Sequence, residues 1–208
     1  NPKIRVGLSP AFSVSSLIQV FSALQEKHNL CFDITEKGDS IAVAEMVSHG
    51  EADIGLVRDI IPYPDLETSF ICNDRLIFIV NRDHPLARVP EITKEHLSNQ
   101  TMICYQRRTP LWRKIDEQLV GVHNLNRIEV GSFEMVKSMV GEKWGFSIIP
   151  KLALGVDENG NPEHRLAVVP FPEFDQMSFR VIGIYKKDSP KKGNLELFMH
   201  FLRAELNR

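Results

Sequence analysis

Hydroxyl, guanidinium and aromatic side chains follow the ends of short apolar segments at four places in the 208-residue sequence. Arginine binds a carboxylate through two parallel hydrogen bonds, and a helix start offers free N–H groups and a positive dipole end to the same kind of group. These residue types therefore predict a binding site for a small anion, such as a carboxylate or a phosphate. The candidate contacts are Ser9, Phe12, Ser13, Arg58, Gln106, Arg107, Thr109, Ser132 and Phe133.

Each candidate also has a purely structural interpretation. The serine and threonine hydroxyls can simply cap the helices that follow them, and the aromatic rings can pack in a core. Arg58 either binds an anion or forms a surface or inter-lobe salt bridge; if it binds an anion, alanine in its place should weaken binding with little change to the fold. Which of Arg107 and Arg108 faces a ligand stays open. Asp53, at the opposite end of the segment before Arg58, is expected to accept structural hydrogen bonds.

The sequence contains no recognisable catalytic or metal-binding constellation. No serine lies in a G-x-S-x-G context, and His84 in "DHPLA" is interpreted as a turn residue rather than a general base. Cys31, Cys72 and Cys104 are far apart and lack the spacing of metal sites. We therefore expect neither an enzyme nor a metal or other cofactor, and a redox role for Cys104 stays open.

The composition is that of an ordinary globular protein, with 43% apolar and 25% charged residues. A formal net charge of −2 gives no reason to expect strong nonspecific attraction to nucleic acid. No apolar run approaches the ~20 residues of a membrane span, and the first residues show no signal-peptide pattern. Scattered thiols are typical of a reducing compartment. A cytoplasmic location without membrane contact is therefore expected.

Hydrophobic periodicity predicts the same β-α-β-α-β order twice, with helices capped near Ser13, by Asp39 or Ser40, by Thr109 and by Ser132, and a further helix at the C-terminus. The expected strands are 3–8, 30–35, 52–57, 74–80, 101–105, 126–131, 145–150, 165–171 and 179–187. This order predicts an α/β fold with two lobes. Chain crossings would divide it into lobe I, residues 1–80 with 181–208, and lobe II, residues 81–180.

Four segments carry a resemblance to a known family: "IRVGL" with a serine-rich helix start, "EMVSHGEADIGLVR", "DRLIFIVNRDHPLA" and "MVKSMVGEKWGFSIIP". In this order and spacing they resemble the effector-binding domain of LysR-type transcriptional regulators, over nearly all of residues 3–206. Two departures are visible. Glu142-Lys143-Trp144 replaces the usual glycine before Gly145, and Ala52 stands where leucine is common.

The resemblance implies two Rossmann-like lobes around a central cleft, as in type 2 periplasmic binding proteins. It implies a ligand-sensing domain of a bacterial transcription factor, which binds a small metabolite, here expected to be anionic, in the cleft and so regulates DNA binding by the full-length protein. The N-terminal winged helix-turn-helix of such a protein is expected to be absent from this chain. A homodimer or tetramer is implied, with the helices near 14–27 and 132–141 at the dimer edges and a hinge near 79–80 and 180–181. A free-standing solute-binding protein of the same fold is the alternative.

Overall fold

The computed structural model describes residues 2–59 and 63–208. The chain forms two compact units: unit 1 comprises Asn1–Asp74 and Phe179–Arg208, and unit 2 comprises Arg75–Ser178. It passes between them within β4 (Leu66–Asn81) and β9 (Ser178–Lys186). The crossings expected after residues 80 and 180 lie in the same two strands.

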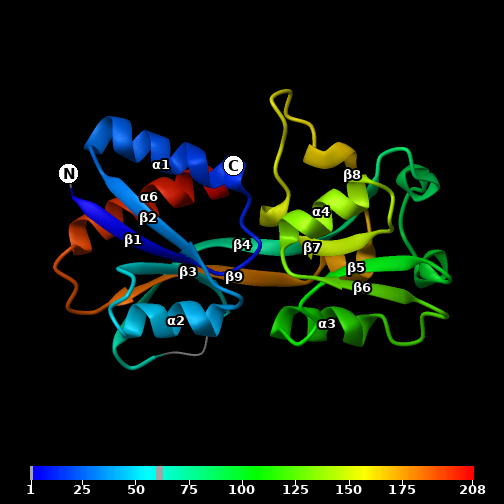
Figure 1. The fold of residues 1–208 in the computed structure, drawn as a ribbon, viewed down its shortest axis with the longest axis horizontal. Helices are drawn as coiled ribbons and strands as arrows, with labels where there is room; N and C mark the ends of the chain where they lie inside the picture. Colours follow the sequence, from blue (N-terminus) through cyan, green and yellow to red (C-terminus); the bar gives the residue numbers. More distant parts are fainter. Residues whose placement is uncertain (1, 60–62) are drawn as a thin grey trace. The chain divides into compact units, whose positions relative to one another are not determined.

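The other elements of unit 1 are β1 (Lys3–Leu8), α1 (Val14–His28), β2 (Cys31–Glu36), α2 (Ser40–Ser48), β3 (Ile54–Arg58) and α6 (Lys192–Leu206). Strands follow the order β2-β1-β3-β9, with β1 parallel to both of its neighbours and β9 antiparallel to β3. Helices α1 and α6 lie side by side on one face of this sheet and α2 lies on the other (Figure 1). This arrangement leaves the ends of β1 and β3 to position the loops that follow them.

Polar side chains set the starts of the unit 1 helices as the sequence predicts. The Ser13 hydroxyl accepts a hydrogen bond from the Ser16 N–H at 3.4 Å and so caps α1. The Asp39 carboxylate accepts from the Ala42 N–H at 2.7 Å and caps α2. After α2 the chain turns through Gly50, whose φ of 76° is easy for glycine because it has no Cβ.

The helices and strands that lie wholly in unit 2 are β5 (Thr101–Tyr105), α3 (Pro110–Gln118), β6 (Asn126–Val130), α4 (Phe133–Gly141), β7 (Ser147–Pro150), β8 (Leu166–Val169) and α5 (Pro172–Asp175). Strands β5 and β6 form a parallel pair, and β7 and β8 pair antiparallel with β4. Figure 1 shows α3 and α4 on opposite sides of β5 and β6. Among the described residues, no helix is both long and apolar enough to cross a bilayer.

The largest difference from the predicted elements is the length of β4. The sequence predicts a strand over 74–80, whereas β4 begins at Leu66. Between the buried Leu66 and Ile71 the side chains are intermediate or exposed, with Glu67 and Ser69 among the polar residues, so no continuous apolar run marks this half of the strand. The short helix α5 was not predicted either.

The departure from the family pattern before Gly145 has a clear structural consequence. Lys143 takes the left-handed conformation, with φ of 67°, at the place where α4 ends and glycine would be unstrained. Gly145 itself cannot be replaced easily, because a Cβ there would lie 2.1 Å from the carbonyl oxygen of Thr101. The chain thus keeps the glycine that allows close approach to β5 and tolerates a lysine at the helix end.

Candidate ligand-binding site

Four of the predicted contacts lie in unit 1, at the end of the sheet where β1 and β3 finish. Leu8 and Leu56 are paired there, and Ser9 donates its N–H to the Leu56 carbonyl at 3.0 Å. Ser9 is only 3% exposed, and its hydroxyl has no hydrogen-bond partner among the described residues. A buried hydroxyl without a partner costs roughly 1–3 kcal/mol. A hydrogen bond from the Ser9 hydroxyl to a polar ligand atom would therefore offset this cost.

Arg58, the last residue of β3, is engaged inside unit 1. Its Nε and one terminal nitrogen donate to the Asp74 carboxylate at 3.3 and 2.8 Å, and its terminal nitrogens also reach the carbonyls of Pro10 and Ala11 at 2.6 and 2.7 Å. The side chains of Arg58 and Asp74 are 9% and 1% exposed. The guanidinium carbon lies 4.3 Å from the centroid of the Phe12 ring.

This arrangement changes one expectation drawn from the sequence. The ion pair of Arg58 is buried within one unit, rather than at the surface or between lobes. Alanine at this position would leave the Asp74 carboxylate buried without its cation, which is strongly destabilising. Contrary to the sequence-based expectation, replacement of Arg58 should therefore disturb the fold.

The other predicted contacts lie in unit 2, where β5 and β6 end side by side. Tyr105 and Val130, the last residues of these strands, are paired in register. The loop before α3 and the start of α4 therefore begin at the same edge of this sheet. Phe133, in the first turn of α4, is buried and stacks on Tyr105 with ring centroids 4.7 Å apart.

The two helix starts of unit 2 differ in their capping. The Ser132 hydroxyl accepts from the Met135 N–H at 3.1 Å, as predicted. Thr109 holds the N-cap position of α3, but its hydroxyl donates to the Gln106 carbonyl at 3.0 Å instead of capping the helix. The turn from Gln106 to Thr109 competes for this hydroxyl, so the predicted side-chain cap is absent and the first N–H groups of α3 receive no capping side chain.

The two arginines of this turn are both exposed. Arg107 pairs with Asp116 of α3 at 2.9 Å, and Asp116 also contacts Arg127 at 3.2 Å. Part of the charge of Arg107 is thus balanced inside the unit. Gln106 is exposed beside these groups.

Asp53 has the structural role that the sequence predicts. Its carboxylate accepts the Arg5 backbone N–H at 2.8 Å, the Arg5 guanidinium at 2.8 Å and the Lys191 ammonium at 2.9 Å. Burial alone would raise the pKa of Asp53, but the hydrogen bonds from Arg5 and Lys191 outweigh it and lower this pKa to about 2. The acid at the start of β3 therefore joins β3 to β1 and to the residue before α6.

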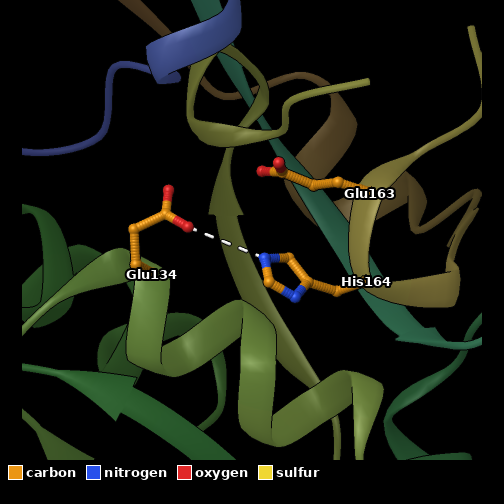
Figure 2. A group of neighbouring side chains, drawn as sticks. All are labelled: Glu134, Glu163 and His164. Atoms are coloured by element: carbon orange, nitrogen blue, oxygen red, sulfur yellow. Dashed lines mark ion pairs between the residues drawn. The ribbon is translucent and has the colours of Figure 1, made fainter. Parts of the chain in front are cut away.

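Figure 2 shows a group of carboxylates and an imidazole in unit 2: Glu134 on α4, with Glu163 and His164 on the turn before β8. Their ligand-type atoms lie within 4.8 Å of one another, and Glu134 Oε2 is 3.6 Å from His164 Nε2. Carboxylate oxygens and imidazole nitrogen are ligands for divalent cations. The group therefore has to be tested as a possible metal site.

Lys137 occupies the position that a cation would take in this group. Its side chain is 1% exposed, and its ammonium contacts Glu134 at 2.7 Å, Glu163, and the Ala153 carbonyl at 2.8 Å. The carboxylates are thus already balanced by a buried ammonium. We interpret the cluster as an ion-pair network that fastens the turn around Glu163 to α4.

Sequence reasoning missed Lys137. It follows Glu134 by three residues in a helix, and this spacing is typical of an exposed pair on a helix surface. Nothing local indicates that Glu163 arrives from a distant turn. A cavity of about 470 Å³ lies near this network and contains none of the predicted contacts. It is lined by Asn81, Ser138, Gly141, Glu142, Lys143, His164 and Arg165.

The three cysteines are reduced thiols, and two of them, Cys72 and Cys104, are buried. Burial raises the pKa of Cys104 to about 12 and that of Cys72 to about 11. A thiol needs to be a thiolate to react quickly with oxidants, so neither group is primed for redox chemistry near neutral pH.

Solved structures with this fold include several regulatory domains. The reduced regulatory domain of OxyR from Pseudomonas aeruginosa has a TM-score of 0.77 and 17% identity, with 98% of each chain covered. The CcmR regulatory domain of Synechocystis PCC6803, solved in complex with 2-PG, has a TM-score of 0.76 and 16% identity, with 98% of this chain and 97% of that chain covered. At these identities the likeness shows the fold alone, which is the predicted periplasmic-binding-protein-like α/β fold.

The family described as LysR substrate binding domain matches residues 1–207. The chain belongs to this family, as the sequence motifs indicated. The family and its homologues are transcription regulators and not enzymes, which agrees with the expectation drawn from the sequence.

Curated relatives support the same assignment over half of the chain. A probable RuBisCO transcriptional regulator of Cyanidioschyzon merolae is 30% identical over 112 residues, which cover 50% of this chain and 36% of the relative. The regulator MetR of Salmonella typhimurium is 28% identical over 107 residues, which cover 50% of this chain and 33% of MetR. The match spans about a third of the length of these relatives.

Proposed function

We propose that this chain is the ligand-sensing part of a longer LysR-type regulator and that it binds a small anionic metabolite in a cleft between its two lobes. Ligand then shifts the lobes toward one arrangement, to the extent that it binds that arrangement more tightly, and so alters DNA binding by the full-length protein. Family membership and the regulator relatives favour this function over a free-standing solute-binding protein. The proposed location is the cytoplasm, where the DNA partner is.

The observation that best supports an anionic ligand is the uncapped start of α3. The helix has no side-chain cap, its first residue is Pro110, and the exposed Arg108 precedes it by two positions. The N–H groups of Leu111 and Trp112 are the donors that this positive helix end offers to an anion. The start of α4 lies at the same edge of the β5–β6 pair. That CcmR was solved with 2-PG makes phosphorylated compounds reasonable ligands to try.

The predicted residues divide by role in this proposal. We assign polar contacts with the ligand to Ser9, Ser13, Gln106, Arg107, Thr109 and Ser132, walls of the site to Phe12 and Phe133, and a place beside the ligand to Arg58. The unpartnered hydroxyl of Ser9 supports its assignment, because a ligand oxygen would satisfy it.

A thermal-shift screen over small carboxylic acids and phosphorylated metabolites, 2-PG among them, tests the ligand class. Anions that bind should raise the melting temperature, and more so the more tightly they bind, while uncharged analogues should not. A screen in which only uncharged compounds stabilise the chain would contradict an anionic effector.

Ser9→Ala then tests the site with whichever anion of that screen raises the melting temperature most. Since the Ser9 hydroxyl is buried without a partner, its removal should leave stability unchanged or higher, whereas affinity should fall by about 1 kcal/mol, roughly five-fold. Ser48→Ala, whose hydroxyl donates to Asp65 away from this turn, is the matched control. Unchanged affinity in Ser9→Ala would remove Ser9 from the site.

We also propose that the chain forms a homodimer through α1 and α4, the helices expected at the dimer edges. Both carry exposed apolar side chains: Val14 and Ile18 on α1 are 58% and 54% exposed, and Met135 on α4 is 51% exposed. Exposed apolar positions on these two helices support an isologous contact, in which the same surfaces of two copies meet. DNA would be bound by a part of the regulator outside this chain.

A further inference from the structure

One guanidinium joins the turn before α1 to the strand in which the chain leaves unit 1. Arg58 holds two successive carbonyls of the turn, those of Pro10 and Ala11, and at the same time the carboxylate of Asp74 on β4. Asp74 is the last residue of unit 1, and the chain continues from it into unit 2. Two segments that are far apart in the sequence are thus tied to the same buried group.

The turn depends on this contact for its shape. Ala11 has φ of 73°, a left-handed conformation that is strained for a residue with a Cβ. Such a conformation persists only where its surroundings enforce it. The Ser9 N–H anchors the start of the turn on Leu56, and Arg58 holds the two carbonyls that follow. The position of Ser9 and the start of α1 at Ser13 therefore follow the position of the guanidinium.

The other end of the contact is equally constrained. The Asp74 side chain is 1% exposed, so its carboxylate cannot exchange the guanidinium for water without a large desolvation cost. The Phe12 ring covers the guanidinium from one side and limits its movement further. A displacement at either the turn or β4 is therefore passed to the other segment rather than absorbed by solvent.

We propose that Arg58 is a positioning residue that couples the ligand-contacting turn Ser9–Ser13 to β4 at Asp74. This role deepens the proposed function and rests on it, because the turn matters only if Ser9 and Ser13 contact the effector. Arg58 need not touch the ligand itself. Its four hydrogen bonds to Asp74, Pro10 and Ala11 transmit the position of the turn to the strand that enters unit 2.

Amide hydrogen exchange in the ligand-free chain tests the coupling. The reporters are the hydrogen-bonded N–H groups of Ser9, Ser16 and Leu17, which bracket the turn. Asp74→Asn keeps the sequence of the turn and Arg58 itself but weakens the ion pair between Arg58 and residue 74. The matched control is Asp53→Asn, which weakens the ion pairs of another buried carboxylate of unit 1, at the opposite end of β3.

Coupling predicts that Asp74→Asn speeds exchange of these three amides at least ten-fold more than Asp53→Asn does, because only Asp74 shares a guanidinium with the carbonyls of the turn. An increase below ten-fold would overturn the proposal. If Asp74→Asn does not fold, Arg58→Lys gives the second reading: its single ammonium keeps a cation beside Asp74 but cannot hold both carbonyls, so the same ten-fold criterion against Asp53→Asn applies. The exchange experiment contains no ligand, so a negative result would contradict the coupling but not the proposed ligand class. In the same way, an unsuccessful ligand screen would not change the exchange result.

Discussion

Replacement of Asp53 by asparagine should remove a pH-dependent part of the stability of the fold. The Asp53 side chain is 9% exposed and its carboxylate holds two cations, Arg5 and Lys191, together with the Arg5 backbone N–H. These contacts lower the pKa of Asp53 from 3.8 to about 2 against the opposing effect of burial. Asparagine keeps the shape of the group but loses the charge that both cations face.

The size and sign of the effect follow from that pKa. Each unit of pKa difference between folded and unfolded chain is worth about 1.36 kcal/mol, so the ionised Asp53 stabilises the fold by about 2 kcal/mol. Because the folded pKa is the lower one, this contribution is fully present above the unfolded pKa near 4. It is lost as the pH falls toward 2, where the folded carboxyl takes up its proton as well.

Urea unfolding of the parent chain and Asp53→Asn between pH 2.5 and 7 measures this contribution as a difference. At pH 6 the variant should be less stable by about 2 kcal/mol, and the gap should narrow progressively below pH 4. Asp33→Asn is the matched control, because Asp33 pairs with Lys3 at 2.7 Å but both side chains are more than half exposed. Its effect should stay below about 0.5 kcal/mol at every pH. A gap for Asp53→Asn that is the same at pH 2.5 and pH 6 would refute the reasoning.

Three further predictions concern the core, the thiols and the assembly. Lys137→Met should lower the free energy of unfolding by about 3 kcal/mol in urea titrations, because it leaves the carboxylates that Lys137 contacts without a buried cation. The control Lys151→Met, at an exposed lysine, should change this free energy by less than about 0.5 kcal/mol. Equal effects of the two substitutions would contradict the ion-pair network. Ellman's reagent should titrate only the partly exposed Cys31 in the native chain and all three thiols in guanidinium, and rapid native reaction of Cys104 would contradict its raised pKa. Sedimentation at tens of micromolar should show a dimer that Ile18→Asp converts to monomer, and a parent chain that is monomeric would exclude α1 as a dimer edge.

Local signals were sufficient for most of the fold. Ser13 and Ser132 were predicted as caps, and Asp39 as one of two alternatives, because such side chains satisfy N–H groups only three residues away. The structural role of Asp53 was also predictable, since an acid at the start of a buried strand needs donors. Thr109 shows the limit of this reasoning, because its hydroxyl donates to the Gln106 carbonyl in the turn that precedes α3 instead of accepting from a helix N–H.

Partners that arrive from distant parts of the chain could not be predicted. Arg58 lies 16 residues from Asp74 and 48 from Pro10, and no periodicity relates these positions. The same holds for Lys137, whose carboxylate partner Glu163 is 26 residues away. Each contact depends on where folded elements meet, which a single sequence does not specify. The residue types at strand ends thus indicated a site but not which arginine would be free to bind a ligand.

The charged residues at the two ends of β3, Asp53 and Arg58, have different structural roles because they bind different segments of the chain. At one end Asp53 binds Arg5 of β1 and Lys191, the residue before α6, so it holds β1 and the starts of β3 and α6 together. At the other end Arg58 binds a strained turn to β4, so it holds an irregular segment that no β-ladder hydrogen bonds stabilise. The start of β3 at Asp53 therefore allows little movement. The irregular end can respond to a ligand, and its response reaches β4 because the guanidinium is shared with Asp74.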